Sequence, residues 1–176
     1  MIETDRIILR KWRPADLDPF AAMCADPRVM ATLGPVMTRD ETAALIARVE
    51  DIGNRYGMTF WAMEQRADGT FLGWCGLKPG AAGTPIEQDM EIGWRLRYEV
   101  WGRGYAREAA QASLRWAWDN TGTASVAAIT TPGNKRSWGL MERLNMDRAH
   151  GQDFDHPDVP DGSPLKRHIT YRILRP

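Results

Sequence analysis

The stretch from Met90 to Trp118 constrains the fold of this chain more than any other, because its hydrophobic period changes at a pair of glycines. From Met90 to Leu96, apolar and polar residues alternate, which is the two-residue period of a strand. From Ala106 to Ala117, small residues recur at helical spacing. Between them, Gly102 and Gly104 can adopt backbone angles closed to other residues. The sequence therefore predicts a strand, a tight turn and a helix, in that order.

A strand that leads through a glycine turn into a helix makes a corner suited to phosphate. The first N–H groups of a helix have no partner within the helix, and the helix dipole adds partial positive charge there. Arg103 and Arg107 lie beside this corner and supply full charges. The alternative is a plain strand-to-helix connection whose glycines only relieve strain, since a lone Gly-x-Gly is a weak signal.

The turn resembles motif A of the GNAT N-acetyltransferases, in which Gln/Arg-x-x-Gly-x-Gly/Ala follows a strand. Here the pattern falls on Trp101 to Ala106, and Trp101 stands where the family usually has Gln or Arg. The segment WGRGYAREA is most similar to the branch that includes the ribosomal-protein alanine N-acetyltransferases. The resemblance implies that acetyl-CoA is the cosubstrate. It also implies that the cofactor lies along the main chain of two segments, Trp94, Arg95 and Leu96, and Gly102, Arg103, Gly104, Tyr105, Ala106 and Arg107.

Length and composition are those of an ordinary globular protein. The 176 residues can bury a proper core, and we expect a single domain over 1–176 because no linker or repeat divides them. The 23 basic and 23 acidic side chains balance, so we expect neither a nucleic-acid nor a membrane partner. The N-terminal segment lacks the apolar stretch of a signal peptide, which favours a cytoplasmic location. Cys24 and Cys75 are too few for a disulfide framework, and we expect both to be reduced.

The remaining segments predict the other elements of such a fold. Thr38 and Glu41 form a capping box before one helix, Asn145 is expected to end another, and the Asp-Pro pair at 26–27 breaks an earlier one. Periodicity alone gives an α/β or α+β class. The resemblance adds the GNAT fold, a mixed and mostly antiparallel sheet that helices flank and that is splayed at the acetyl-CoA site. We expect strands near 7–9, 59–64, 71–77, 90–96, 125–130, 146–150 and 168–174, and helices near 17–24, 39–56, 105–118 and 134–144.

Glu91 is the first candidate for the base that deprotonates the acceptor amine. It lies on the central strand, two residues before Gly93, and a carboxylate there could take the proton directly or through a water. Gly93 itself would let a ligand approach the strand closely. Asp89 is the second candidate. The alternative is that Glu91 only pairs with Arg95, its neighbour on the same strand face.

A second set of candidates follows from the resemblance, on the stretch Thr131-x-x-Asn134-x-x-Ser137. In the branch, the Asn lies near the pantetheine arm and the Ser near the sulfur. Ser137 would then assist the leaving thiolate by a hydrogen bond or a bound water, because a Ser is a weak general acid. Structural alternatives are a plain helix N-cap for Asn134 and an ordinary first-turn residue for Ser137.

The segment from Gly151 to Lys166 reads as a proline-broken loop with four aspartates. Pro157 and Pro160 interrupt any EF-hand spacing, so we expect no metal site. Its prolines resemble those of the same acetyltransferase branch. We expect the loop to close one wall of the acceptor site, with a solvated connection as the alternative.

These observations predict an acetyl-CoA-dependent N-acetyltransferase that works by direct transfer to a primary amine in a ternary complex. By a small margin, the expected acceptor is the N-terminal α-amine of a protein or peptide. One alternative is a small amine such as a polyamine, an amino acid or an antibiotic. Another is a non-catalytic module that binds acyl-CoA. Homodimers are common in the branch, and a homodimer stays open here.

Overall fold

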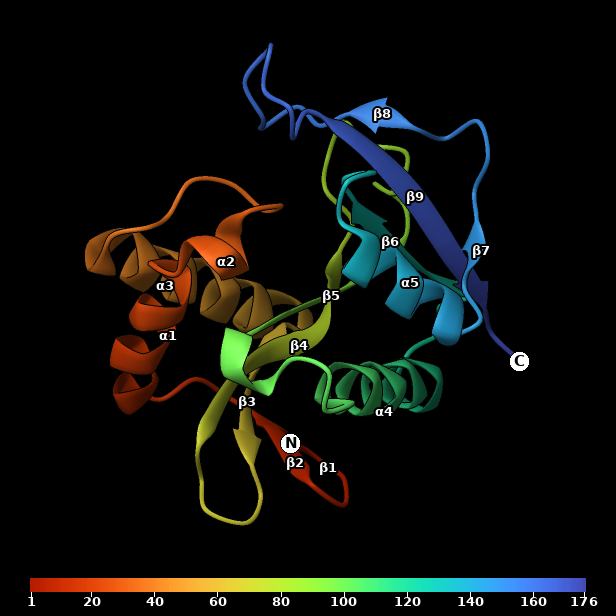
Figure 1. Ribbon diagram of the computed structural model, residues 1–176. Helices are drawn as coiled ribbons and strands as arrows, with labels where there is room; N and C mark the ends of the chain where they lie inside the picture. Colours follow the sequence, from red (N-terminus) through yellow and green to blue (C-terminus); the bar gives the residue numbers. More distant parts are fainter.

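A computed structural model describes residues 1–176, the whole chain (Figure 1). Its strands form one curved sheet with helices on both faces. The strands are β1 (Ile2–Glu3), β2 (Ile7–Arg10), β3 (Phe60–Gln65), β4 (Phe71–Pro79), β5 (Met90–Leu96), β6 (Ser125–Thr130), β7 (Asp147–Arg148), β8 (Phe154–Asp155) and β9 (Arg167–Leu174). The helices are α1 (Leu17–Cys24), α2 (Pro27–Met30), α3 (Arg39–Tyr56), α4 (Tyr105–Asn120) and α5 (Lys135–Arg143).

The sheet is mixed and mostly antiparallel, as predicted. Its strand order is β1-β2-β3-β4-β5-β6-β9-β7, with β8 pairing to β9. Every neighbouring pair is antiparallel except β5 with β6. That parallel pair holds for two residues of β5, Met90 and Glu91, whereas β4 follows β5 along its whole length. The sheet is therefore splayed between β5 and β6.

Local sequence signals set the ends of several helices where they were expected. The Thr38 hydroxyl accepts from the Glu41 N–H while the Glu41 carboxylate accepts from the Thr38 N–H, which makes a complete capping box for α3. Gly57 ends the same helix in the left-handed conformation, with φ 71°. Asn145, after α5, has φ 60° and is the only non-glycine residue with positive φ. The cap expected at Asn145 is thus confirmed.

Three short elements were missed or misread. Asp26 does not simply break the chain, because its side chain accepts from the Arg28 N–H and caps the four-residue helix α2. The loop from 151 to 166 contains β8, which pairs with the start of β9. β1 adds two residues at the other edge of the sheet. Each element is two to four residues long, too short for periodicity to identify it.

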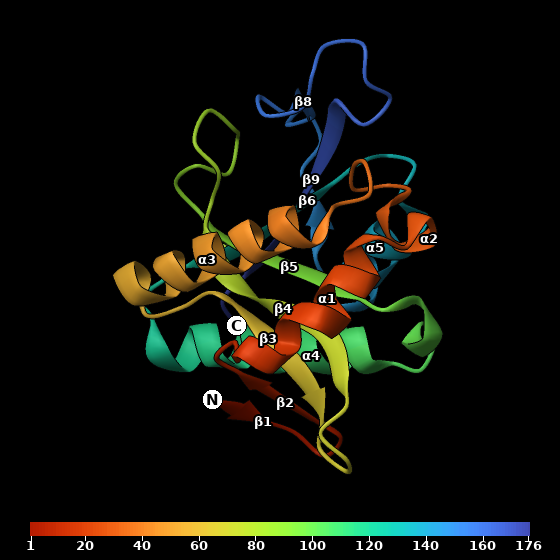
Figure 2. The same cartoon turned by 90° about the vertical axis from the view of Figure 1, so that its left-hand side faces the viewer.

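The two faces of the sheet bury separate apolar clusters. On one face, α4 packs on alternate residues of β4 and β5 such as Cys75, Leu77 and Ile92, and its small residues allow close approach. On the other face, α1 and α3 cover a smaller cluster around Phe20 and Phe71. Figure 2 looks onto this second face. Residues of β5 therefore point alternately toward α4 and toward α1 and α3.

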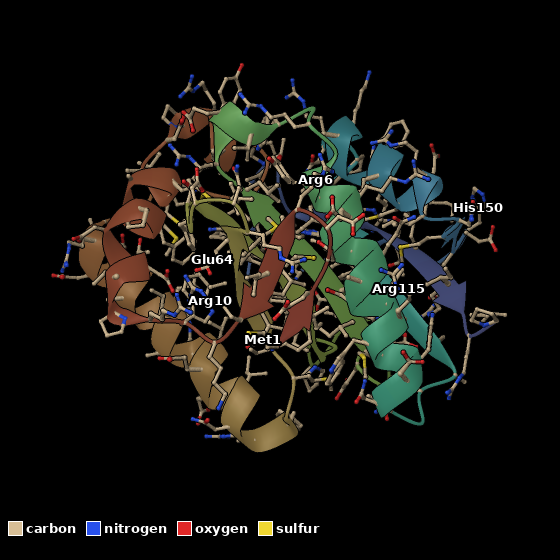
Figure 3. The ribbon with its side chains drawn as sticks, turned by 90° about the horizontal axis from the view of Figure 1, so that it is seen from below. Met1, Arg6, Arg10, Glu64, Arg115 and His150 are labelled. Atoms are coloured by element: carbon tan, nitrogen blue, oxygen red, sulfur yellow. The ribbon has the colours of Figure 1, made fainter.

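A buried ionic network ties β2 to this second face. Arg10 donates to Asp16 and to Glu64, and all three residues are less than a tenth exposed. Figure 3 shows Arg10 and Glu64 side by side from below. Judged by length and hydropathy, none of the helices could span a lipid bilayer.

Candidate functional site

The glycine turn before α4 has the geometry of an anion-binding corner. Gly102 and Gly104 have φ of 75° and 82°, and a Cβ built on Gly102 would meet nothing within 4 Å. No side chain caps the N-terminus of α4, where Gly104 is the N-cap. The N–H groups of the first turn are therefore free for a ligand. Arg103 and Arg107 are exposed beside them and form no ion pair.

Arg6 holds this corner in place, a role that the sequence did not indicate. Its guanidinium donates to the Arg103 carbonyl at 2.9 Å and to the Glu108 carboxylate at 2.6 Å, and it lies 4.7 Å from the centre of the Tyr105 ring. Figure 3 shows Arg6 beside α4. Burial acts to raise the pKa of Glu108, but hydrogen bonds from Thr4 and Arg6 outweigh it and lower that pKa.

We call the gap that the splay leaves between β5 and β6, beside residues 92–96 of β5, the cleft. After Glu91, the edge of β5 that faces β6 has no strand partner, so alternate backbone N–H and C=O groups point into the gap. At the end of β6, the Thr131 hydroxyl is buried without a hydrogen-bond partner. Unpaired buried groups are costly unless a ligand or a water satisfies them. The cleft therefore presents polar groups to an elongated ligand.

α5 begins a few residues after β6, the strand on the other side of the cleft. Asn134 is the N-cap, and its side chain accepts from the Ser137 N–H at 3.2 Å, so the structural role considered for Asn134 is confirmed. Lys135 and Arg136 occupy the first turn, where the helix dipole disfavours cations. Arg136 lies 4.8 Å from the centre of the Trp101 ring, which brings α5 to the glycine turn. Two unpaired cations at a helix N-terminus suit an anionic ligand.

Trp101 stands where motif A usually has Gln or Arg, and it makes a contact of its own. Its indole N–H donates to the Leu96 carbonyl at 2.9 Å, which ties the turn to the end of β5. The Trp94 side chain points to the α4 face and packs on the core there, so only its main chain faces the cleft. The backbone cradle thus survives the sequence departure at Trp101.

The Glu91 carboxylate lies where β5 and β6 part. Its ion-pair partner is Lys78, directly opposite on β4, and not Arg95. The alternative of a Glu91–Arg95 pair is therefore wrong, because the β4–β5 register places a cation nearer. Asp89, the second candidate, is bound to Arg172 at 2.7 Å and accepts from the Ser125 hydroxyl at 3.1 Å. Asp89 thus fastens β5 to β6 and β9.

A groove of about 690 Å³ opens on the same face, between β3–β5 and the helices α1 and α3. Phe60 and Trp74 form its floor as a stacked pair, with ring centres 4.3 Å apart. A Cβ on Gly93 would lie 3.0 Å from Phe60 and 3.3 Å from Trp74, so the central strand needs glycine beneath these rings. Lys78 and Arg95 also line the groove. This groove can hold a largely apolar molecule beside Lys78, the ion-pair partner of Glu91.

The loop from 151 to 166 reaches this groove through Asp158, which forms part of its lining. The Asp158 N–H donates to Nδ1 of His156 at 3.2 Å, and the His156 ring lies 4.9 Å from that of His168. Burial lowers the pKa of His168, the Lys166 carbonyl opposes this, and the charge of His156 adds to the lowering. No cluster of His, Cys, Asp and Glu suited to a metal ion is present.

We expect acid to destabilise the β8–β9 hairpin, whose connecting loop carries Asp158. A His pKa lowered by folding stabilises the protein above the unfolded value of about 6.5, and this stability is lost as pH falls through the folded value. Melting temperature should therefore drop between pH 7 and pH 5.5 by on the order of 2 °C more in wild type than in His168→Phe. His150→Phe, an exposed histidine labelled in Figure 3, is the control. Equal losses in all three proteins would contradict this role for His168.

The structure places the predicted residues on the elements around the splay. Gly102 to Arg107 follow the free part of β5, Asn134 and Ser137 begin the helix after β6, and Glu91 is the last residue of β5 paired with β6. Sequence reasoning missed Arg6, Lys78 and Arg136. Only Arg136 had a usable signal, a basic side chain in a helix first turn.

An open sheet, a glycine corner at a helix N-terminus and an adjoining groove define the architecture of the GNAT acetyltransferases. The sequence profile of the acetyltransferase (GNAT) domain matches residues 6–147. An uncharacterized Bacillus subtilis (strain 168) protein, YkkB, is 34% identical over 146 residues, which span 81% of this chain and 83% of the relative. This chain belongs to the GNAT family, whose members use acetyl-CoA and transfer its acetyl group to amines.

Solved structures share the fold over nearly the whole chain. An acetyltransferase from Agrobacterium tumefaciens str. C58 is similar with a TM-score of 0.79 and 24% identity, over 99% of this chain and 94% of that one. RimL, the ribosomal L7/L12 alpha-N-protein acetyltransferase in complex with coenzyme A, gives a TM-score of 0.77 and 14% identity, over 97% and 95%. At these identities the likeness concerns the fold.

Proposed function

We propose that residues 1–176 act as one domain that transfers the acetyl group of acetyl-CoA directly to an amine bound in the groove. One observation carries this proposal. Glu91 is the last residue of β5 that pairs with β6, and its ion-pair partner Lys78 lines the groove. A carboxylate at this position can reach an amine that lies against the end of a cofactor bound in the cleft.

The cleft has the groups that acetyl-CoA needs. The N–H groups at the start of α4, with Arg103 and Arg107, would bind the pyrophosphate. The free edge of β5 over Trp94, Arg95 and Leu96 would bind the pantetheine arm and polarise the thioester carbonyl. Thr131 and Asn134 would complete the wall opposite. Bound acetyl-CoA supplies the activated acetyl group.

Glu91 would accept a proton from the acceptor amine, which is mostly protonated at neutral pH. Its ion pair with Lys78 holds the carboxylate in place on the strand face. Ser137, half-buried in the first turn of α5, would donate a hydrogen bond to the departing thiolate, directly or through a water.

The cysteines support direct transfer without an acyl-enzyme. Cys24 and Cys75 are free and fully buried. Burial raises the pKa of Cys75 to about 12 and also raises that of Cys24. A thiol attacks a thioester as the thiolate, so neither side chain is available as a nucleophile at neutral pH.

The acceptor that we favour by a small margin is the N-terminal α-amine of a peptide or protein, as in the name of RimL. A panel of acceptors with constant acetyl-CoA tests the proposal, read by mass spectrometry. It holds peptides that begin with Ala, Ser or Met, polyamines, amino acids and aminoglycosides. Acetylation of peptide α-amines supports the preference, and acetylation of small amines alone moves the function to metabolism. No acetylation of any amine would contradict catalysis and leave only a binding module.

Arg6→Ala should weaken acetyl-CoA binding, because the glycine turn loses its bond from Arg6 to the Arg103 carbonyl. We expect KM for acetyl-CoA to rise about 10-fold, the equivalent of one charge-assisted hydrogen bond, with kcat little changed. Arg66→Ala is the control, since Arg66 donates to the Thr4 carbonyl in the same β1–β2 turn and bonds no residue of α4. Steady-state kinetics decide, and an unchanged KM would remove Arg6 from the cofactor site.

A further inference from the structure

Arg95 projects into the acceptor groove without a carboxylate partner. Its Nε is buried and makes no hydrogen bond, and its Nη1 donates only to the Cys24 sulfur at 3.4 Å. Burial raises the pKa of Cys24 although the Arg95 charge opposes this, so the thiol stays neutral near pH 7 and does not balance the guanidinium. A half-buried Arg without a counter-charge costs free energy. Such a residue is therefore unusual unless a ligand supplies the counter-charge.

The other charged groups of the groove do not balance Arg95. Its lining contains three cations, Arg48, Lys78 and Arg95, against the single carboxylate of Asp158. Lys78 is already paired with Glu91, whereas Arg48 forms no ion pair. The chain as a whole is neutral. The groove therefore carries a local excess of positive charge, which suits an anionic group on the acceptor.

The floor between the two charged ends is aromatic. Glu91, Gly93 and Arg95 lie on one face of β5, and the rings of Phe60 and Trp74 cover Gly93. The Arg95 guanidinium lies 5.7 Å from the centre of the Trp74 ring. Glu91 and Arg95 are thus on opposite sides of the aromatic pair, which separates a place for an amine from a place for an anion.

We propose that the acceptor carries a carboxylate that Arg95 binds, on an apolar or aromatic body that lies over Phe60 and Trp74. The inference rests on the proposed function, since it names the substrate class of that site. Arg95 is chosen over Arg48 because Arg48 is exposed at the rim. A planar guanidinium binds a carboxylate in a bidentate manner, and that of Arg95 has no carboxylate partner within the chain.

The carboxylate has two sources, the α-carboxylate of a free amino acid or the side chain of an acidic residue that follows a peptide α-amine. The test therefore uses two matched pairs of acceptors. Phenylalanine is compared with phenylalaninamide, and the amide of Phe-Asp with that of Phe-Asn. Each pair is assayed for kcat/KM with wild type, Arg95→Gln and Arg95→Lys. Because the variants are compared on the same pair, differences in amine basicity within a pair cancel.

We expect wild type to prefer the acidic member of at least one pair by about 10- to 100-fold, the effect of a hydrogen-bonded charge pair. Arg95→Gln should abolish this preference, measured as the ratio of kcat/KM for the acidic and the neutral member of the pair, and Arg95→Lys should restore part of it. Which pair responds identifies the source of the carboxylate. The control is Arg115→Gln, an exposed cation on α4 across the sheet, labelled in Figure 3.

Other outcomes overturn the inference in distinguishable ways. Equal rates on acidic and neutral acceptors, or a preference that Arg95→Gln leaves intact, would reject carboxylate binding by Arg95 while acetyl transfer stands. A different result would be that Arg95→Gln loses transfer to neutral acceptors and melts at a lower temperature, with Arg95→Lys showing the same defects. That result would show a structural role for Arg95. No transfer to any amine by wild type would reject the proposed function itself.

Discussion

Replacing Glu91 with Gln should lower kcat by about 10²- to 10⁴-fold, the usual contribution of a positioned general base. Glutamine keeps the shape of the side chain but cannot accept the proton of the amine. The dissociation constant of acetyl-CoA should stay the same, because the cofactor groups lie along the cleft and not on the Lys78 side of β5. Steady-state assays of thiol release measure kcat, and calorimetry measures the dissociation constant of acetyl-CoA.

The ion pair complicates the variant, because Glu91→Gln leaves Lys78 without its partner. The double variant Glu91→Gln with Lys78→Gln removes both charges, and its kcat should stay as low as that of the single variant. Glu50→Gln, an exposed carboxylate on α3, controls for the substitution itself. If kcat in Glu91→Gln stays within a factor of three of wild type, Glu91 is not the base.

The second large effect is expected for Gly102→Val. At φ 75°, a β-branched residue is strained, and its side chain would enter the open space in front of the turn. That space is where the proposed pyrophosphate lies. Loss of charge-assisted bonds from the turn and the first N–H groups of α4 should weaken acetyl-CoA binding by about 100-fold or more.

Gly69→Val separates backbone strain from loss of the site. Gly69 has φ 73°, also with nothing within 4 Å of a built Cβ, but it lies in the β3–β4 turn. Both substitutions should lower the melting temperature by a similar amount. Acetyl-CoA should raise the melting temperature of wild type and of Gly69→Val, but not that of Gly102→Val. A normal cofactor-induced rise in Gly102→Val would exclude the turn as the pyrophosphate site.

Local signals made much of the fold predictable. The period change at Gly102, the capping box at Thr38 and the left-handed cap at Asn145 were each encoded within a few residues, and each was confirmed. The splay of the sheet followed from the family resemblance and not from periodicity. It is confirmed by the two-residue pairing of β5 with β6.

The contacts within the site were less predictable, because they depend on register between segments distant in sequence. Lys78 meets Glu91 through the β4–β5 register, and a shift of one residue would have turned it to the other face. Arg6 reaches Glu108 across more than a hundred residues. In the sequence, Arg95 stood out as a neighbour of Glu91 and as part of the main-chain segment expected to bind the cofactor. Its lack of a partner is visible only in three dimensions.

The most direct test of the central claim follows both products of one reaction by mass spectrometry. Enzyme, acetyl-CoA and an amine acceptor are mixed, quenched at successive times and analysed as intact protein and as acceptor. The account predicts that the acceptor gains one acetyl group at the rate of thiol release while the mass of the enzyme stays constant. An acetyl group that appears on the enzyme before the acceptor, or thiol release without acetylated amine, would contradict direct transfer at this site.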